Sequence, residues 1–223
     1  MPVVDREWTE FRRRVDDAVL VGFAMVRESL ARATASLLDE DKARAKQVVA
    51  EDRDIDEHCA ALSAMVKERL TETIGRPAEL EELVLILQMI PELERSADLA
   101  EHIARRAIDG LGARLSPRPR GLIQSMNDTA VGMWLTAAAG YEQRSRDTGY
   151  ALAEADDELD GLAADLVEEA IGSVTDSRAA AELVLLARFY ERSGDHAVNL
   201  AKRVESMVAP RRVTAARLIS GRP

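Results

Sequence analysis

The sequence predicts an all-α protein, a tandem repeat of two three-helix bundles with six helices in all. Its 223 residues are 47% hydrophobic but only 4% aromatic, and this aliphatic composition favours packed helices over a β-sheet. Apolar residues recur at three- and four-residue intervals over long segments, which is the helical period. The phrase Glu-Arg-Ser-(Ala or Gly)-Asp occurs at 94–98 and again at 191–195. The chain is therefore expected to repeat one helical unit.

Breaks in the apolar periodicity divide the chain into six helical segments. In the first half, an acidic run at 39–41 and a Gly-Arg-Pro run at 75–77 interrupt the pattern, as helix ends do. Similar breaks in the second half lie near Asp147 and at 173–176. The predicted helices cover about residues 6–38, 42–74, 78–108, 122–144, 148–174 and 177–208.

A proline-containing stretch separates the two halves. Pro117 and Pro119 lie in it, and proline cannot continue a helix because it lacks a backbone N–H. The end of the chain holds four arginines and no acid, so we expect a flexible basic tail there. The expected parts are a first repeat at 1–111, a linker at 112–121, a second repeat at 122–208 and the tail at 209–223.

Charge and composition exclude several classes of protein. The formal net charge of -10 argues against nucleic-acid binding, which needs a concentrated basic surface. Cys59 is the only cysteine, so we expect no internal disulfide and interpret it as a buried structural thiol. The N-terminus lacks a signal-peptide pattern, and the longest strongly apolar stretch, 83–91, is too short to span a bilayer. We expect a cytoplasmic protein that meets a membrane only through its partners.

Paired acids are the strongest candidates for a binding site. The repeated phrase places two acids four residues apart, and on a helix that spacing puts both carboxylates on one face. A second helix in each half carries an Asp-x-x-x-Asp pair, and an antiparallel arrangement would bring the two pairs together. Four converging carboxylates repel one another unless cations neutralise them. The predicted metal ligands are Asp52, Asp56, Glu94 and Asp98 in the first repeat, and Asp156, Asp160, Glu191 and Asp195 in the second.

Oxygen-rich ligation suits Mg²⁺, Mn²⁺, Ca²⁺ and iron. A single acid pair is more often part of a solvated helix face, but four pairs at matched positions favour a site. A ferritin-like di-iron site needs Glu-x-x-His on two helices, and the sequence has no such motif. We interpret His58 and His196 as helix-surface residues and leave His102 open between ligand, neighbour of a ligand and surface residue. The sequence has no phosphate loop, catalytic triad or zinc motif, so we expect a non-enzymatic protein.

The two repeats differ in length between their acid pairs. Asp56 and Glu94 are 38 residues apart, whereas Asp160 and Glu191 are 31 apart. Seven residues correspond to about one helical turn in each arm of a hairpin. The second bundle is therefore expected to be the shorter one, with the geometry near the acids unchanged.

The run Leu186 to Ala201, LARFYERSGDHAVNLA, closely resembles the C-terminal signature of the PhoU family of bacterial phosphate-transport regulators. The resemblance implies a cytoplasmic homodimer of paired three-helix bundles that binds iron, manganese, magnesium or zinc through Glu/Asp-x-x-x-Asp motifs. It also implies an adaptor between the ATPase subunit of a phosphate ABC transporter and a sensor histidine kinase. Such an adaptor represses the phosphate response when phosphate is plentiful.

The first repeat departs from this signature. It has Ala97 in place of Gly194 and Leu99 in place of His196, and Pro91 comes shortly before its acid pair. Proline removes one helical hydrogen bond and can kink the helix, which makes the geometry of the first site less secure. Two other hypotheses stay open: a metal-storing or metal-sensing bundle without a phosphate role, and a structural module whose acids only tune solubility.

Overall fold

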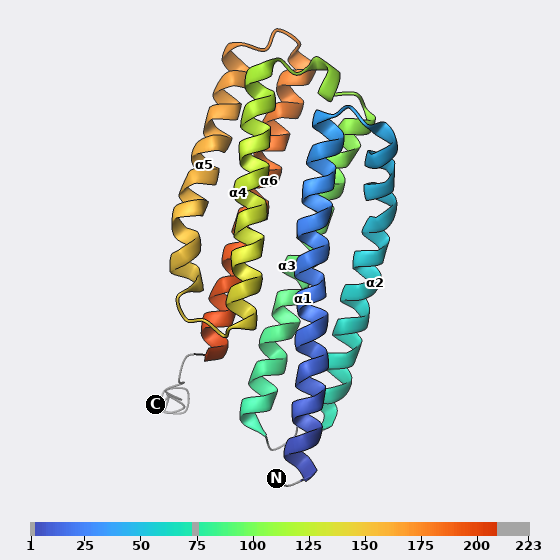
Figure 1. Cartoon of the computed structure of the whole chain (residues 1–223), viewed down its shortest axis with the longest axis vertical. Coiled ribbons are helices and arrows are strands. Elements are labelled where there is room, and N and C mark those ends of the chain that lie inside the picture. Colours follow the sequence, from blue (N-terminus) through green and yellow to red (C-terminus); the bar gives the residue numbers. More distant parts are fainter. Residues whose placement is uncertain (1–2, 73–75, 209–223) are drawn as a thin grey trace, which may run out of the picture.

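The computed structural model describes residues 3–72 and 76–208, with side chains from residue 6 onward. These residues form six α-helices, one short 3-10 helix and no strand, which confirms the all-α prediction (Figure 1). The elements in chain order are α1 (Val3–Leu38), α2 (Lys42–Glu72), α3 (Pro77–Ile108), η1 (Gly112–Arg114), α4 (Pro117–Glu142), α5 (Thr148–Gly172) and α6 (Ser177–Val208).

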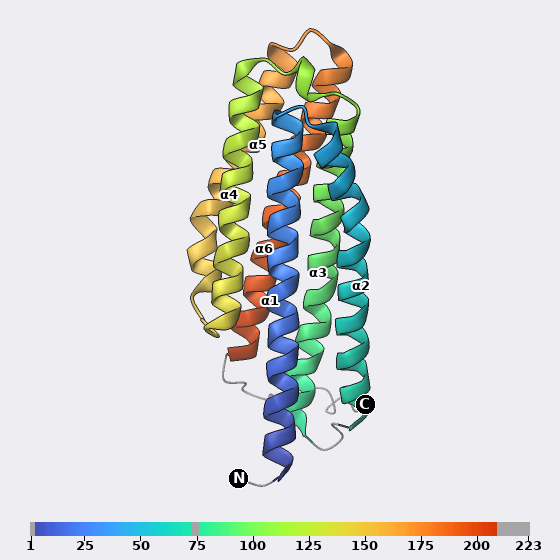
Figure 2. The ribbon, with the colours of Figure 1, turned by 45° about the vertical axis from the view of Figure 1, so that its right-hand side comes forward.

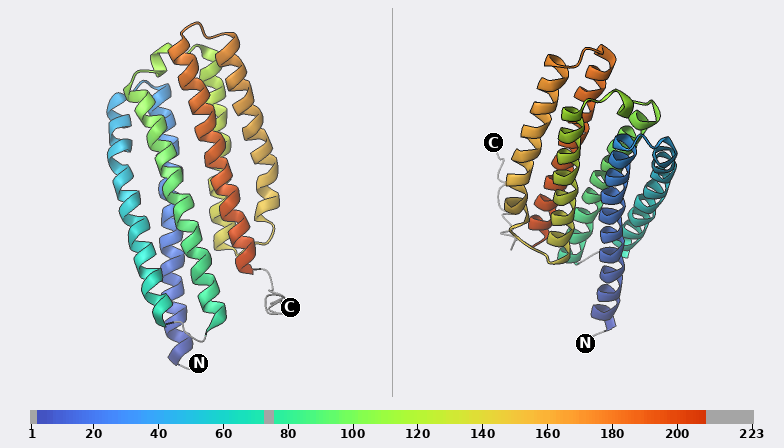
Figure 3. Two further views of the ribbon diagram at one scale, coloured as in Figure 1. Left: turned by 180° about the vertical axis from the view of Figure 1, so that it is seen from behind. Right: turned by 45° about the horizontal axis from the view of Figure 1, so that its top comes forward.

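Each repeat is an up-down-up bundle, and the two bundles lie side by side along their length (Figures 1 and 2). α1 packs against α4, and α3 packs against α6. From behind, α3 and α6 run in opposite directions between α2 and α5 (Figure 3). The α2–α3 and α5–α6 pairs, which carry the predicted ligands, therefore lie on either side of the contact between the repeats.

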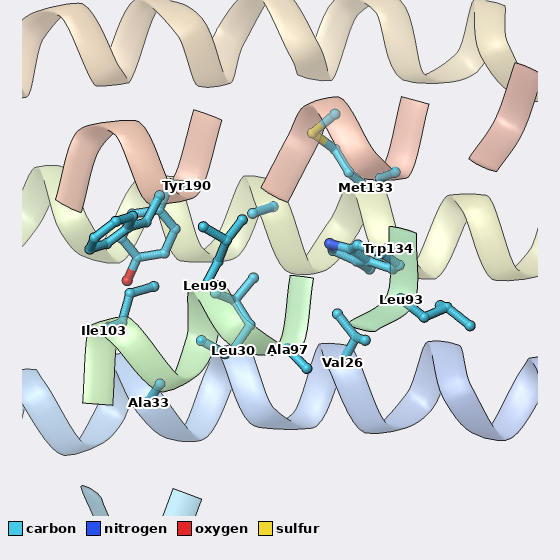
Figure 4. Packing of buried hydrophobic residues seen from close by; sticks show 14 of the residues in the cluster. Val26, Leu30, Ala33, Leu93, Ala97, Leu99, Ile103, Met133, Trp134 and Tyr190 are labelled. Atoms are coloured by element: carbon cyan, nitrogen blue, oxygen red, sulfur yellow. The ribbon is translucent and has the colours of Figure 1, made fainter. Parts of the chain in front are cut away.

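One apolar core runs through both repeats. Leu30 from α1, Leu93 from α3, Trp134 from α4 and Tyr190 from α6 are all fully buried in it (Figure 4). The indole Nε1–H of Trp134 donates a hydrogen bond of 3.0 Å to the hydroxyl of Ser193 on α6, which satisfies a polar group that burial would otherwise leave unpaired. The repeats are thus packed into one unit.

In the described residues, the helices of the first hairpin are longer than those of the second, as expected. α2 continues for 16 residues beyond Asp56, whereas α5 continues for 12 beyond Asp160. α3 contains 17 residues before Glu94, and α6 contains 14 before Glu191. The differences of four and three residues account for the seven, about one helical turn in each arm.

The linker is shorter than predicted, because α4 begins at Pro117 and not near residue 122. Proline suits the first turn of a helix, where the backbone N–H has no intrahelical partner, so Pro117 starts α4. Arg120 then fixes the connection: its guanidinium donates to the carbonyl oxygens of Leu38 at 2.5 Å and Gly112 at 2.7 Å. The end of α1 and the start of α4 are joined by this side chain.

Within the described ranges, 3–72 and 76–208, no helix has the length and apolar character needed to cross a membrane. The expected basic tail, residues 209–223, lies outside the described residues, as does the predicted end of the second helix at 73–74.

Candidate functional site

The first acid cluster comprises the four carboxylates predicted as ligands in the first repeat. Asp52 and Asp56 are one turn apart on α2, and Glu94 and Asp98 are one turn apart on α3. Asp52 is half-buried and the other three are exposed. The cluster therefore lies on the outer surface of the α2–α3 pair and not in the core of the bundle.

The charges of acids on α2 and α3 affect one another across the helix pair. The pKa of Asp52 is raised to about 6, first by burial and then by negative charges that include Glu101 and Asp98 on α3. The pKa of Asp98 is raised as well, first by burial and then by the charge of Asp56 on α2. Asp52, Asp56 and Asp98 are therefore close enough for each charge to affect its neighbours, while the convergence of all four carboxylates on one ion stays a prediction.

Glu94 and Asp56 meet at a surface groove of about 360 Å³ between α2 and α3. Cys59 lines the same groove and is buried, as expected. The pKa of its thiol is raised to about 12, first by burial and then by the charges of Glu94 and Asp56. A thiol with such a raised pKa stays protonated at neutral pH, so Cys59 is a poor nucleophile and a poor thiolate ligand.

The second acid cluster comprises Asp156 and Asp160 on α5 with Glu191 and Asp195 on α6. The pKa of Asp156 is raised, first by burial and then by the charges of Asp160 and Asp195. The pKa of Asp160 is raised, first by burial and then by the charges of Glu191 and Asp195. The charges of acids on α5 and α6 thus also affect one another across this helix pair.

A second surface groove, of about 550 Å³, lies between α5 and α6 and includes Asp160 and Glu191. These two acids occupy the positions that Asp56 and Glu94 occupy in the first repeat. The two grooves are therefore the same feature of the repeat, formed twice. In each repeat the carboxylate cluster borders a shallow depression with an apolar floor.

Two acids near the clusters were not predicted. Glu101 has a side chain only 15% exposed and raises the pKa of both Asp52 and Asp98. It follows Asp98 by three residues on α3, and that spacing alone predicts that both residues lie on the same face of the helix. In the second repeat, Asp157 adds negative charge near both Asp156 and Asp160. Neither residue has an acid at the matching position of the other repeat. The matched acid pairs on which the prediction rested therefore do not include them.

The donor set fits a hard cation. Both clusters offer carboxylate oxygens only, which suit hard ions such as Mg²⁺ and Mn²⁺. The Oδ1 atom of Asp52 is buried and has no hydrogen-bond partner in the described part of the chain, and a bound cation would supply one. In residues 3–72 and 76–208, no three His, Cys, Asp or Glu side chains already form a group that could hold a metal ion. The carboxylates would have to turn toward one ion to coordinate it together.

The predictions for two of the histidines are wrong. His196 is buried and not on the surface, because α3 packs against α6: its Nδ1–H donates to Glu92 Oε2 at 2.6 Å. His58 is half-buried, with Nε2 placed 2.7 Å from the carbonyl oxygen of Ala18 on α1. His102, which the sequence left open, is exposed and lies against the ring of Phe189 with centroids 5.4 Å apart.

Comparisons with known proteins agree with this architecture. The family model described as PhoU domain matches residues 23–107 and 123–204, one match in each repeat. The phosphate-specific transport system accessory protein PhoU homolog 2 of Mycobacterium tuberculosis is 30% identical over 192 residues, covering 83% of this chain and 86% of the relative. A PhoU homolog of Rhizobium meliloti is 23% identical over 215 residues, covering 93% of this chain and 87% of the relative.

Solved structures share the fold. The crystal structure of PhoU from Pseudomonas aeruginosa has a TM-score of 0.83 at 24% identity, covering 90% of this chain and 98% of that chain. The phosphate transport system regulatory protein PhoU from Streptococcus pneumoniae has a TM-score of 0.79 at 19% identity, covering 91% and 95%. With the family model matched to both repeats and over more than half of the sequence, the chain belongs to the PhoU family.

Proposed function

We propose that this protein regulates phosphate uptake as an adaptor between a phosphate ABC transporter and the sensor histidine kinase of the phosphate response. It represses that response when phosphate is plentiful. The observation that carries the proposal is the PhoU domain match to both repeats. Relatives over most of the chain are named accessory proteins of phosphate-specific transport systems, which supports a role beside the transporter.

Metal binding at the two acid clusters is the second part of the proposal. Each cluster opposes carboxylates from two helices, and their raised pKa values reflect burial and mutual repulsion that a cation would relieve. The donor chemistry suits magnesium and manganese best, with iron also compatible and zinc less favoured in the absence of nitrogen or sulfur donors. A bound cation would join α2 to α3, and α5 to α6, at the surface where a partner could sense it.

The adaptor acts by contact and not by catalysis. In this proposal it is a cytoplasmic homodimer, and its partners are the ATPase subunit of the transporter and the kinase. It binds no nucleic acid, in keeping with its net charge of -10. It reaches the membrane only through these partners.

A reporter experiment tests the regulatory role. The gene is deleted in the source organism, and a phosphate-starvation promoter fused to a reporter is measured in high phosphate. Deletion should raise expression, and the wild-type gene supplied in trans should restore repression. A gene with Asn or Gln at all eight cluster positions should fail to restore it, because its product cannot hold the cations.

A matched control separates the clusters from surface charge in general. Glu154 and Glu158 are exposed acids four residues apart on α5, the same helix that carries Asp156 and Asp160. The variant E154Q/E158Q should restore repression fully. Unchanged reporter expression after deletion, in a strain without a second copy of such a gene, would contradict the phosphate role. The metal-storing or metal-sensing bundle and the structural module would then remain as accounts.

A further inference from the structure

Two ion pairs connect the repeats at opposite ends of the contact between α1 and α4. At one end, Arg120 of α4 donates to Glu40, which comes two residues after α1, at 2.5 Å. At the other end, Arg144, which comes two residues after α4, donates to Asp16 of α1 at 2.6 Å. Because α1 and α4 run antiparallel, both pairs belong to one helix–helix contact (Figures 1 and 2).

The two ion pairs occupy matching positions of the repeats. Asp16 and Arg120 are 104 residues apart in the sequence, and so are Glu40 and Arg144. Exchanging the two repeats therefore exchanges the two ion pairs, but it reverses the sign of every charge. Both positions are acidic in the first repeat and basic in the second.

The ends of α1 and α4 have the same backbone conformation. In each, the residue after the left-handed position closes the helix end with a hydrogen bond of 2.9 Å to a carbonyl oxygen of the last turn. The left-handed residues are Glu40, with a φ of 59°, and Arg144, with a φ of 50°. Glycine is usual at such a position because any side chain strains the backbone there. A charged residue at both positions indicates that these side chains are needed for the contact.

Further groups surround the pair at Arg144. The hydroxyl of buried Tyr141 donates to Asp16 at 2.6 Å, and Arg144 also lies 3.1 Å from Glu82 on α3. Arg12 of α1 lies 3.9 Å from Asp16 and 3.0 Å from Glu82. Two acids and one arginine of the first repeat thus leave one negative charge at this end, and Arg144 of the second repeat balances it.

A contact between like repeats would bring equal charges together. If α1 met another α1 in this geometry, Glu40 would face Asp16 at both ends. If α4 met another α4, Arg144 would face Arg120 at both ends. Like charges at this distance repel, and each partly buried charge would also lose its opposite partner.

We infer that these four charges specify which repeat meets which, so that α1 binds α4 and disfavours a second α1. The partner that fits this face of α1 is a second repeat, of the same chain or of another copy. Two copies of the chain can therefore exchange repeats only as first with second. The inference does not rest on the phosphate role or on metal binding.

Urea unfolding of the full chain tests the inference by giving one repeat the charges of the other. D16R/E40R gives α1 the charges of α4, so that the contact carries the charges of two second repeats. R120D/R144E gives α4 acids, as in a contact of two first repeats. Each variant should raise the equilibrium constant for unfolding about tenfold or more, because two attractions between partly exposed groups become two repulsions.

The chain with all four substitutions, D16R/E40R/R120D/R144E, restores opposite charges at both ends. Its unfolding constant should be at least about threefold lower than that of either two-residue variant, because the four charges are coupled in pairs. Recovery should be incomplete, because the substitutions also remove the hydrogen bond from Tyr141 and those from Arg120 to backbone carbonyl oxygens.

Two control variants separate this effect from charge in general. D17R/E68R makes the same change of charge at exposed positions of the first repeat and should alter the unfolding constant less than about threefold. D16N/E40Q removes both attractions without adding repulsion and should destabilise less than D16R/E40R. An effect of overall charge would have opposite signs in the two charge-swapped variants, because they shift the net charge of -10 by four units in opposite directions.

The inference is overturned if D16R/E40R destabilises the chain no more than D17R/E68R does. It is also overturned if the four-residue variant is no more stable than the two-residue variants. Where a two-residue variant does not fold, as judged by circular dichroism, the four-residue variant decides: its folding supports the inference, and its failure to fold overturns it.

Discussion

The Nδ1 atom of His196 lies 2.6 Å from the Oε2 atom of Glu92, and this buried pair joins the two repeats. Arg203 on α6 donates to the other oxygen of Glu92 at 3.0 Å. Burial alone would raise the pKa of Glu92, but the hydrogen bonds from His196 and Arg203 outweigh it and lower the pKa below its ordinary value. The contact between α3 and α6 is thus built around one ionised carboxylate.

Replacing this carboxylate should destabilise the protein. Glu92→Ala leaves His196 and Arg203 at the interface without their acceptor, so the free energy of unfolding should fall by about 2–3 kcal/mol at pH 7. Urea denaturation measures the change. Glu57→Ala removes an exposed acid of α2 and should change stability by less than about 0.5 kcal/mol. An equally small effect of both substitutions would show that the pair contributes nothing to stability.

Replacing Asp52 should stabilise the protein in the absence of metal, whereas replacing Glu92 should destabilise it. Its folded-state pKa of about 6 is above the ordinary 3.8, so protonation stabilises the folded state. That stabilisation is complete below pH 3.8 and is lost as the pH rises through 6. With chelator at pH 7.5, Asp52→Asn should raise the free energy of unfolding by about 1 kcal/mol. This is less than the whole pKa shift would give, because the side chain is partly exposed and solvent screens its charge.

The stability gain of Asp52→Asn should shrink as the pH falls below 6 and vanish near pH 4. Thermal unfolding at a series of pH values, with and without Mn²⁺, gives the measurement. Added Mn²⁺ should stabilise the wild-type chain more than the variant, because the variant lacks one donor. A gain from the substitution that does not depend on pH would contradict the raised pKa of Asp52, which burial and then the neighbouring acids produce.

Two glycines of α4 should respond oppositely to the same substitution. A Cβ atom on Gly140 would lie 2.2 Å from the Oγ1 atom of buried Thr148, which starts α5, so Gly140→Ala should cost about 2 kcal/mol. A Cβ atom on exposed Gly132 meets nothing within 4 Å, and Gly132→Ala should stabilise by up to about 1 kcal/mol through helix propensity. Urea unfolding of both variants gives the signs, and a stabilising Gly140→Ala would contradict the close approach of α4 to α5.

A hydrogen bond between α6 and α1 should behave as a coupled pair. The hydroxyl oxygens of Tyr190 and Thr34 are 2.6 Å apart and buried. Tyr190→Phe should cost about 1 kcal/mol, and Thr34→Val somewhat more, because the Thr34 hydroxyl also donates to the carbonyl oxygen of Leu30 at 2.9 Å. The double variant should cost less than the sum of the two, because the hydrogen bond that the hydroxyls share is lost only once. Strictly additive costs in urea denaturation would argue that the two hydroxyls do not interact.

The sequence predicted those features that depend on local spacing. Asp52 and Asp56 share a helix face because four residues make about one turn, and the matched pair Glu94 and Asp98 follows the same rule. The seven-residue offset between the repeats placed the length difference in the hairpin arms, where the structure has it. Periodicity was sufficient for all of these because each depends on positions within one helix or one hairpin.

The contact between the repeats could not be predicted in the same way. Apolar periodicity shows that a helix face is buried but not which distant helix buries it. His196 was therefore interpreted as a surface residue, and nothing in the periodicity paired it with Glu92. One signal was present: their matching positions in the other repeat are Phe189 and Leu99, so the two repeats exchange polar and apolar residues at one pair of sites. In an antiparallel contact between α3 and α6, such a polar pair and such an apolar pair can each meet across the interface.

The beginning of α4 shows a different limit. Pro117 was interpreted as part of a linker because proline ends helices, although it is equally suited to begin one. Only the packing of Arg120 against the end of α1 decides between these uses. Proline by itself marks the boundary of a helix but does not show whether a helix ends or begins there.

Elemental analysis tests the central claim, that both acid clusters hold metal ions, most directly. The wild-type chain, the variant with all eight cluster acids replaced by Asn or Gln, and E154Q/E158Q are purified without chelator and analysed by inductively coupled plasma mass spectrometry. The wild-type chain and E154Q/E158Q should carry at least one metal ion per cluster, and the eight-acid variant should carry none. A folded wild-type chain that holds no metal and takes up no added Mn²⁺, or an eight-acid variant that holds as much as wild type, would contradict the account.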